Sequence, residues 1–364
     1  MKIKNVTYSF FQTLCLIFLA ALFIIFSKNT RKGAYDGLNL AMNTVVPSLL
    51  PLLIIFLTFM KSSANNILIK LFGNFSRVFF NLPKAAFSAI LFGLVGGYPT
   101  GALLSEELFE AGEIDSNQAK RLMCFNFCGG FIITAVGTVT FNSTKLGVML
   151  FLSNAFSSIL IGFVLSFKEK RLEKSEYSLF SFTSLGDALT LATPKAAQSV
   201  IVITAYIVLF SALSSTVKIP EPLLPIIEIT NGVCGGDFSL PLTAAFLSFG
   251  GICIHLQISD VLRKFEMSYF EFLLFRLISS VLSYFIMKLL LYFFPVDLSV
   301  FANASTPVRL SSVNVTLSVL LVAGCFVSVL DLNSRRKVVG KSRNNNVPTF
   351  LIYYLFKHFV HLLF

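Results

Sequence analysis

The amino-acid sequence predicts an all-α polytopic membrane protein. Hydrophobic residues make up 55% of its 364 residues and charged residues only 13%, and the mean hydropathy is +0.80. So few polar residues cannot coat a soluble body of this size. The apolar stretches are continuous, and several approach the roughly 20 residues that a helix needs to cross a bilayer. A transmembrane barrel would show short alternating segments instead.

The charged residues and possible metal ligands exclude several classes of function. The net charge is +11, but the basic residues lie between apolar stretches, where they act as topology signals and not as a nucleic-acid surface. Six cysteines and three histidines form no zinc signature. We therefore expect no nucleic-acid partner, no metal and no cofactor.

The first half begins with a predicted span at residues 7–26, interpreted as an uncleaved signal anchor within an N-terminal segment, 1–32. A second span is expected at 45–60. The next apolar run, from Ala85, stops after about a dozen residues at the cluster 96–101, which is too short to cross and predicts a half-helix broken at a Gly/Pro turn. The acidic residues of 105–118 are expected in water or at the interface.

The remainder of the first half contains an interrupted piece and a complete span. Residues 122–140 carry Asn126 and are interrupted by glycines, and 146–167 form a full span. These segments complete a first repeat, 33–167. The basic loop 168–184 follows, and its cluster Lys168 to Lys174 predicts a cytoplasmic side.

The second half, 185–331, repeats the plan. Its expected elements are an amphipathic approach at 185–195, a span at 196–217, a Pro-rich turn at 219–225, broken regions at 226–236 and 240–257, and spans at 269–294 and 311–330. The tail 332–364 has a basic, cytoplasmic cluster from Arg335 to Arg343 and a short aromatic segment, 348–364, expected on the membrane surface. This gives about eight membrane-embedded helical units. The side of the N-terminus stays open.

The doubled pattern of broken helices is typical of a transporter whose substrate binds at the breaks. We expect two re-entrant hairpins, with tips near 97–101 and near either 232–236 or 250–251. An alternative is that the glycines only allow close helix packing. The candidate substrate-binding residues are Gly97, Tyr98, Pro99, Thr100, Gly101, Asn126, Thr230, Asn231, Gly250, Gly251 and Gln257.

Glu228 is the candidate residue for coupling to an ion or a proton. A carboxylate flanked by isoleucines is costly at membrane depth and usually faces a pathway or a partner. The alternative is an interfacial loop position. Asn126 and Gln257 are equally consistent with hydrogen bonds between helices, and His255 is expected to make one structural hydrogen bond.

Several stretches together resemble a known family, the YlbJ or SpoVV-like sporulation integral membrane proteins within the nucleoside-recognition or Gate-domain superfamily. The matching stretches span roughly 33–295 and lie at 44–51, 97–102, 126–131, 143–147, 228–232 and 249–257. The chain departs from the family pattern at Gly130, where a proline is usual. The resemblance implies a role in endospore formation. It also implies passage of dipicolinic acid from mother cell to forespore across the outer forespore membrane, and an elevator-like arrangement similar to concentrative nucleoside transporters.

The leading hypothesis is therefore transport of a small anionic metabolite across a bacterial cell membrane, with a coupling cation or proton. A non-transporting assembly or sensor protein and a nucleoside-type transporter are the alternatives. The chain has no paired catalytic residues, so we do not expect an enzyme, and it has no Walker motif, so transport would be secondary or passive. A homo-oligomer is also compatible with the sequence, which fixes neither the substrate nor the coupling ion.

Overall fold

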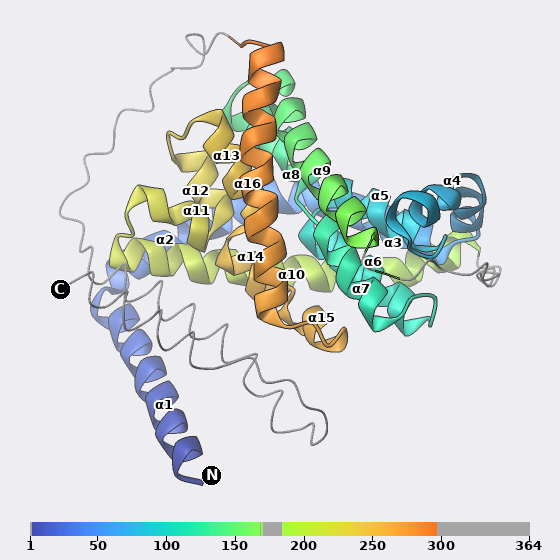
Figure 1. The fold of residues 1–364 in the computed structure, drawn as a ribbon. Coiled ribbons are helices and arrows are strands. Elements are labelled where there is room, and N and C mark those ends of the chain that lie inside the picture. Colours follow the sequence, from blue (N-terminus) through green and yellow to red (C-terminus); the bar gives the residue numbers. More distant parts are fainter. Residues whose placement is uncertain (1, 168, 170–183, 297–364) are drawn as a thin grey trace.

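The computed structural model describes residues 2–167, 169 and 184–296 (Figure 1). The predicted span at 311–330, the aromatic segment at 348–364 and the tail cluster at 335–343 lie outside the described residues, as does most of the basic loop. Within the described ranges every regular element is helical. The expected all-α class is confirmed.

The first half consists of long helices that alternate with shorter ones. The elements are α1 (Lys2–Ile25), α2 (Ser27–Leu40), the π-helical η1 (Ala41–Val45), α3 (Val46–Lys61), α4 (Ala64–Phe80), α5 (Ala86–Gly96), α6 (Tyr98–Glu110), α7 (Ser116–Leu122), the 3₁₀ turn η2 (Met123–Phe125), α8 (Gly129–Phe131), the π-helical η3 (Ile132–Thr140) and α9 (Thr144–Ser166).

The second half has the same order of long helix, short hairpin, broken helix and long span. Its elements are α10 (Leu185–Val217), the 3₁₀ turn η4 (Glu221–Leu223), α11 (Leu224–Ile227), α12 (Ile229–Gly235), α13 (Leu240–Phe249), α14 (Gly251–Gln257), α15 (Ser259–Lys264) and α16 (Tyr269–Phe293).

Six helical stretches in the described part of the chain are long and apolar enough to cross a membrane: Ser27–Lys61, Ser116–Thr140, Thr144–Ser166, Leu185–Val217, Leu240–Gln257 and Tyr269–Phe293. The basic residues that follow α1 lie within α2. Helix α2 runs through the π-helical η1 into α3, and Pro47 lies directly after η1.

The helices form two groups, α16 with α13 and α9, and α10 with α2 and α3 (Figure 1). Helix α16 packs along α13 and α9, whereas α10 packs along α2 and α3 and runs across α16. The short broken helices lie between these two groups. This arrangement places the breaks in the interior of the molecule.

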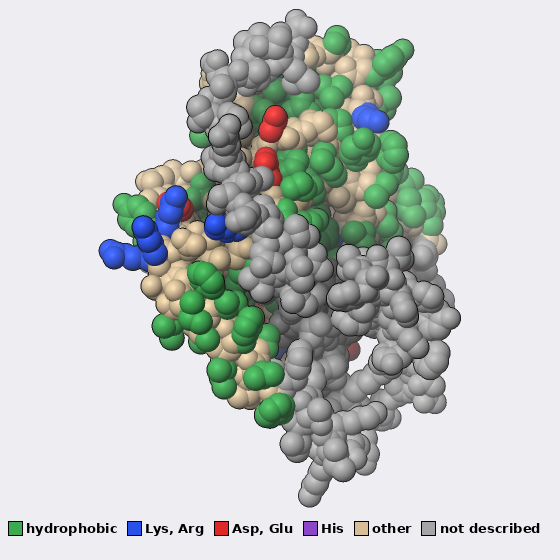
Figure 2. Space-filling view, turned by 90° about the vertical axis from the view of Figure 1, so that its left-hand side faces the viewer, with side chains coloured by type: hydrophobic (Ala, Val, Ile, Leu, Met, Phe, Trp, Pro, Cys, Tyr) green, Lys and Arg blue, Asp and Glu red, His purple; other side chains and the backbone are tan. Residues whose placement is uncertain are grey.

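Many hydrophobic side chains lie on the face of the described chain that Figure 2 shows. Many large hydrophobic side chains are exposed on the long helices, as expected of surfaces that face lipid and not water. Examples at more than half exposure are Ile201, Phe285, Tyr292 and Phe293. Together with the six candidate spans, this surface defines a multi-pass integral membrane protein.

Candidate functional site

The chain turns back on itself at Gly97, within the predicted cluster. Helices α5 and α6 pack together, and a Cβ added to Gly101 would lie 3.0 Å from the Cα of Gly93, eight residues earlier. Gly97 has φ +101°, a conformation that side chains disfavour. The first predicted hairpin tip is therefore present in the structure.

The second half is interrupted at Glu228, between α11 and α12, and also at both predicted glycine clusters, since α12 ends at Gly235 and α13 ends before Gly250. Helices α11 and α12 pack against each other, and a Cβ on Gly232 would lie 2.3 Å from the Pro225 nitrogen. Gly232 therefore serves a close contact, while the turn is made by extended backbone at Glu228. The Glu228 carboxylate caps α12, because its two oxygens accept the N–H groups of Thr230 at 2.8 Å and Asn231 at 2.7 Å.

Two further helices are interrupted at the same depth of the fold. In the first half the helix unwinds at 126–128, between η2 and α8. In the second half it breaks at Gly250 and Gly251, which have φ +89° and +75°. A Cβ on Gly250 would lie 2.7 Å from the Tyr98 ring, and one on Gly251 would lie 3.1 Å from the Pro225 carbonyl oxygen. The breaks of the two halves therefore meet.

Each broken helix is capped by a side chain from the opposite half. Arg276 of α16 donates to the carbonyls of Asn126 at 2.6 Å, Met123 at 2.8 Å and Cys124 at 3.1 Å. The Tyr98 hydroxyl donates to the Ser248 carbonyl at 2.6 Å, near the end of α13. These bonds satisfy carbonyls that an interrupted helix leaves without partners.

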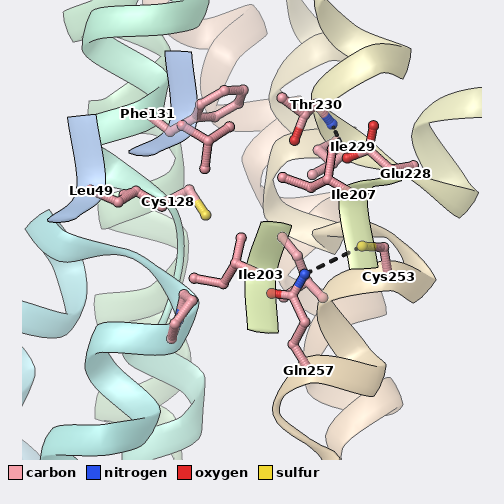
Figure 3. Close-up of a pocket in the computed structure, with 13 residues that line it drawn as sticks. Leu49, Cys128, Phe131, Ile203, Ile207, Glu228, Ile229, Thr230, Cys253 and Gln257 are labelled. Carbon is pink, nitrogen blue, oxygen red and sulfur yellow. Dashed lines mark hydrogen bonds between the residues drawn. The ribbon is translucent and has the colours of Figure 1, made fainter. Parts of the chain in front are cut away.

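A small cavity lies where the turns and breaks converge (Figure 3). In Figure 3, Leu49, Cys128 and Phe131 form one wall, and Glu228, Thr230, Cys253 and Gln257 form the other. Two side chains of α10, Ile203 and Ile207, lie between them. The lining residues are Val45, Leu49, Pro99, Cys128, Phe131, Ile203, Ile207, Glu228, Ile229, Thr230, Cys253, Ile254 and Gln257.

The cavity is small and mixed in polarity. Water centres can occupy about 30 Å³ of it, room for about two waters. Its polar groups are the Glu228 carboxylate, the Thr230 hydroxyl and the Gln257 amide, whose Oε1 has no hydrogen-bond partner and whose Nε2 donates to the Cys253 sulfur at 3.3 Å. In this conformation the space that water centres can occupy is much smaller than a dicarboxylic acid.

The structure separates the predicted binding residues into two groups. Pro99, Thr230 and Gln257 line the cavity together with Glu228. The others do not line it, and they instead shape the breaks: Gly97, Tyr98, Thr100, Gly101, Asn126, Asn231, Gly250 and Gly251.

Two of these break residues have other hydrogen-bond partners. Asn231 donates to the Ser211 hydroxyl of α10 at 2.5 Å, and the Thr100 hydroxyl donates to the Gly96 carbonyl at 2.9 Å. His255 hydrogen-bonds Tyr269 and the Phe249 carbonyl, each at 2.9 Å. A structural role of His255 agrees with these bonds.

Sequence reasoning missed Arg276. It is an arginine inside a 25-residue apolar helix, which is the same signal that drew attention to Glu228. The cavity is also lined by Val45 of η1 and by Ile203 and Ile207 of α10. No sequence pattern indicated this, because an apolar residue in a span has the same pattern whether it faces lipid or a cavity.

A charged cluster lies at the C-terminal end of α6. Glu107 pairs with Lys61 of α3 at 2.6 Å and with Lys195 of α10. Burial acts to raise the pKa of Glu107, but the hydrogen bonds and charges of the two lysines outweigh it and hold that pKa below its ordinary value. Lys264 of α15 pairs with Glu106, and also with Glu110 at 3.2 Å.

The fold and its converging breaks define a polytopic membrane protein with discontinuous helices around an internal site. The chain is 23% identical, over 319 residues, to the sporulation integral membrane protein YlbJ of Bacillus subtilis strain 168, and the alignment covers 73% of this chain and 78% of that protein. This similarity confirms the resemblance to YlbJ-like sporulation membrane proteins. No family model and no solved structure matches the chain. The wider Gate-domain resemblance stays a prediction.

Proposed function

We propose that this protein is a secondary or passive transporter of a small anionic metabolite, with dipicolinate as the expected substrate. The observation that carries the proposal is the convergence of two turns and two helix breaks, one of each from either half, on one cavity with a buried carboxylate. Irregular backbone at membrane depth is tolerated where it is buried in protein or lines a cavity, and in transporters it forms the binding site.

Because the cavity is so small, the protein must change conformation to carry dipicolinate. A two-water space must widen to admit a dicarboxylate, and the breaks supply the short, separately movable segments that could do this. The mixed walls suit an aromatic acid, because Phe131 and the aliphatic side chains can face a ring while Thr230 and Gln257 offer hydrogen bonds.

Glu228 is the expected coupling group. Its carboxylate repels a dianion, so it does not bind dipicolinate itself, and it is 2% exposed. In this conformation it holds the start of α12. Uptake of a proton or a cation at Glu228 would weaken that cap and remove the repulsion, which links entry of the anion to movement of the hairpin.

The direction expected from the family resemblance is from mother cell to forespore, across the outer forespore membrane. The similarity to a sporulation membrane protein supports this setting. It does not distinguish transport from an assembly or sensor role, and only a transport measurement separates them.

The test uses the purified full chain in lipid vesicles loaded with Tb³⁺, whose luminescence rises when dipicolinate chelates it. We expect uptake well above that of protein-free vesicles. Glu228→Gln keeps one acceptor but places an amide N–H against a backbone N–H, so we expect at least a tenfold slower rate. Gly235→Ala is the matched control, because a Cβ there meets nothing within 4 Å. Wild-type vesicles that take up dipicolinate no faster than empty ones would favour the non-transporting alternative.

A further inference from the structure

Arg276 is a fully buried cation in the middle of an apolar span. It is 0% exposed and lies in α16, one of the six candidate membrane-crossing helices. An arginine side chain stays protonated in proteins. Its burial at membrane depth is costly, and such residues usually mark a pathway or a partner.

The guanidinium has only neutral acceptors. It donates to three backbone carbonyls of the first-half break and, at 3.3 Å, to the Tyr98 hydroxyl. Among the described residues no carboxylate pairs with it, and its Nε has no hydrogen-bond partner. Carbonyl dipoles neutralise the charge in part, and no anion of the described chain completes the neutralisation.

This charge lies directly behind one wall of the cavity. Arg276 contacts Tyr98 and Asn126, while Pro99, next to Tyr98, and Cys128 line the cavity. The guanidinium carbon is 5.3 Å from the centre of the Tyr98 ring, and a Cβ added to Gly97, next to Tyr98, would lie 3.5 Å from the Cys128 sulfur. The separation between the cation and the cavity is therefore about one layer of protein.

The opposite wall carries the carboxyl group of Glu228, the sole acidic side chain among the residues that line the cavity. A solute anion that enters meets repulsion from this carboxylate. Two α12 N–H groups reduce that repulsion, and a fixed cation near the cavity reduces it further. Arg276 is the fully buried cation of the described chain that lies against the cavity wall.

We propose that Arg276 is the specificity-determining residue of the site and makes the cavity favour anions over neutral and cationic solutes. It acts through the wall formed by Tyr98 and Cys128 and not by contact with the solute. The inference deepens the proposed function and rests on it for the identity of the anion, although the sign of the potential can be measured without transport.

Cys128 provides a native probe of that potential. A parent variant keeps Cys128 and replaces the other five cysteines, Cys15, Cys124, Cys234, Cys253 and Cys325, with alanine. The measurement is the ratio of its reaction rates with a negatively and a positively charged methanethiosulfonate of similar size, divided by the same ratio for a free thiol. Thiolate formation affects both rates equally, so the ratio reports the local potential.

We expect the parent ratio to exceed that of Arg276→Gln roughly tenfold or more, because loss of a buried unit charge changes the rates of the two oppositely charged reagents in opposite directions. Arg276→Lys should retain most of the ratio. Tyr98→Phe loses the same hydrogen bond without a change of charge, so its ratio should stay within about twofold of the parent. A purely structural role would instead make Tyr98→Phe and Arg276→Gln behave alike.

The proposal is overturned if the ratio is equal in the parent and Arg276→Gln, if it falls equally in Tyr98→Phe, or if Cys128 reacts with neither reagent. Should Arg276→Gln fail to fold, a parent ratio no greater than that of the free thiol overturns it alone. Vesicle uptake is scored separately, so a high ratio without dipicolinate uptake would sink the proposed function and leave the charge assignment standing.

Discussion

The two halves of this protein build the same pair of interruptions with different chemistry. The hairpin of the first half turns at Gly97, which has a positive φ and no side chain. The hairpin of the second half turns at Glu228, in ordinary extended backbone, with the carboxylate capping the helix that follows. The order of the interruptions is repeated in the two halves, but different residues form them.

This difference distributes the polar groups unequally around the cavity. The second half provides the carboxylate, hydroxyl and amide, whereas the first half provides Pro99, Cys128 and Phe131. The capping is reciprocal, because Arg276 of the second half holds the first break and Tyr98 of the first half holds the second. Each half therefore stabilises the other, and a substitution at one break should also destabilise the other break.

The largest effect is expected at Gly250. An alanine there would have to adopt φ +89° with its Cβ 2.7 Å from the Tyr98 ring. Strained backbone and overpacking each cost about 1–3 kcal/mol, so we expect Gly250→Ala to lower stability by roughly 3 kcal/mol. The measurement is the midpoint of thermal unfolding in detergent. Gly235→Ala, in open space, should change that midpoint little, and equal effects of the two would contradict the assignment of Tyr98 as the cap.

Gly97→Ala separates backbone strain from crowding. The nearest atoms to the new Cβ are the Cα and sulfur of Cys128 at 3.5 Å, an ordinary contact, so only φ +101° is unfavourable. We expect a loss of about 1–2 kcal/mol, less than at Gly250. Gly97→Leu adds a side chain against the wall of the cavity and should reduce uptake more than stability. A loss at position 97 as large as at 250 would mean that the first turn is the more tightly built of the two.

The sequence predicted the first turn for physical reasons that hold in the structure. A dozen apolar residues cannot cross a bilayer, and a Gly-Pro cluster ends helices, so the break near Gly97 follows from length and composition. Glycine also marks the interruptions after α12 and at Gly250 and Gly251. Gly232 permits contact with Pro225, whereas a capping glutamate, which glycine patterns do not reveal, makes the turn between α11 and α12.

Other features depend on distant parts of the chain and left no local pattern. Nothing adjacent to Asn126 indicates that Arg276, 150 residues later, caps its carbonyl. The same holds for the closeness of Tyr98 and Ser248. Local periodicity reports which segments are helical, whereas the cavity arises from which helices cross, and that is a tertiary property.

The halves are also joined outside the cavity, and Glu107 tests that contact. Its carboxylate pairs with Lys61 of α3 and Lys195 of α10, so the two ion pairs hold α6 to these helices. These groups are partly exposed, so we expect Glu107→Gln to cost about 1 kcal/mol. Because the folded pKa of Glu107 is lowered, its contribution is present above the unfolded value of about 4.3 and is lost as pH falls through the folded pKa. The wild-type and variant melting midpoints should converge as the pH falls through the folded pKa of Glu107, and a constant difference would refute the ion pair.

The smallest effect is expected at Lys264, which links α15 of the second half to Glu106 and Glu110 of α6. Hydrogen bonding to Glu106, followed by that to Glu110, raises the pKa of Lys264 to about 12, and its side chain is 40% exposed. Solvent screening reduces the value of such a pair, so Lys264→Ala should cost less than about 0.5 kcal/mol at neutral pH. The sign differs from that of Glu107: the contribution is present below the unfolded value of about 10.5 and disappears as pH rises through 12. Melting in 1 M salt should erase the difference between wild type and variant. A loss that persists in high salt would show that Lys264 stabilises the junction by packing of its aliphatic chain and not by charge.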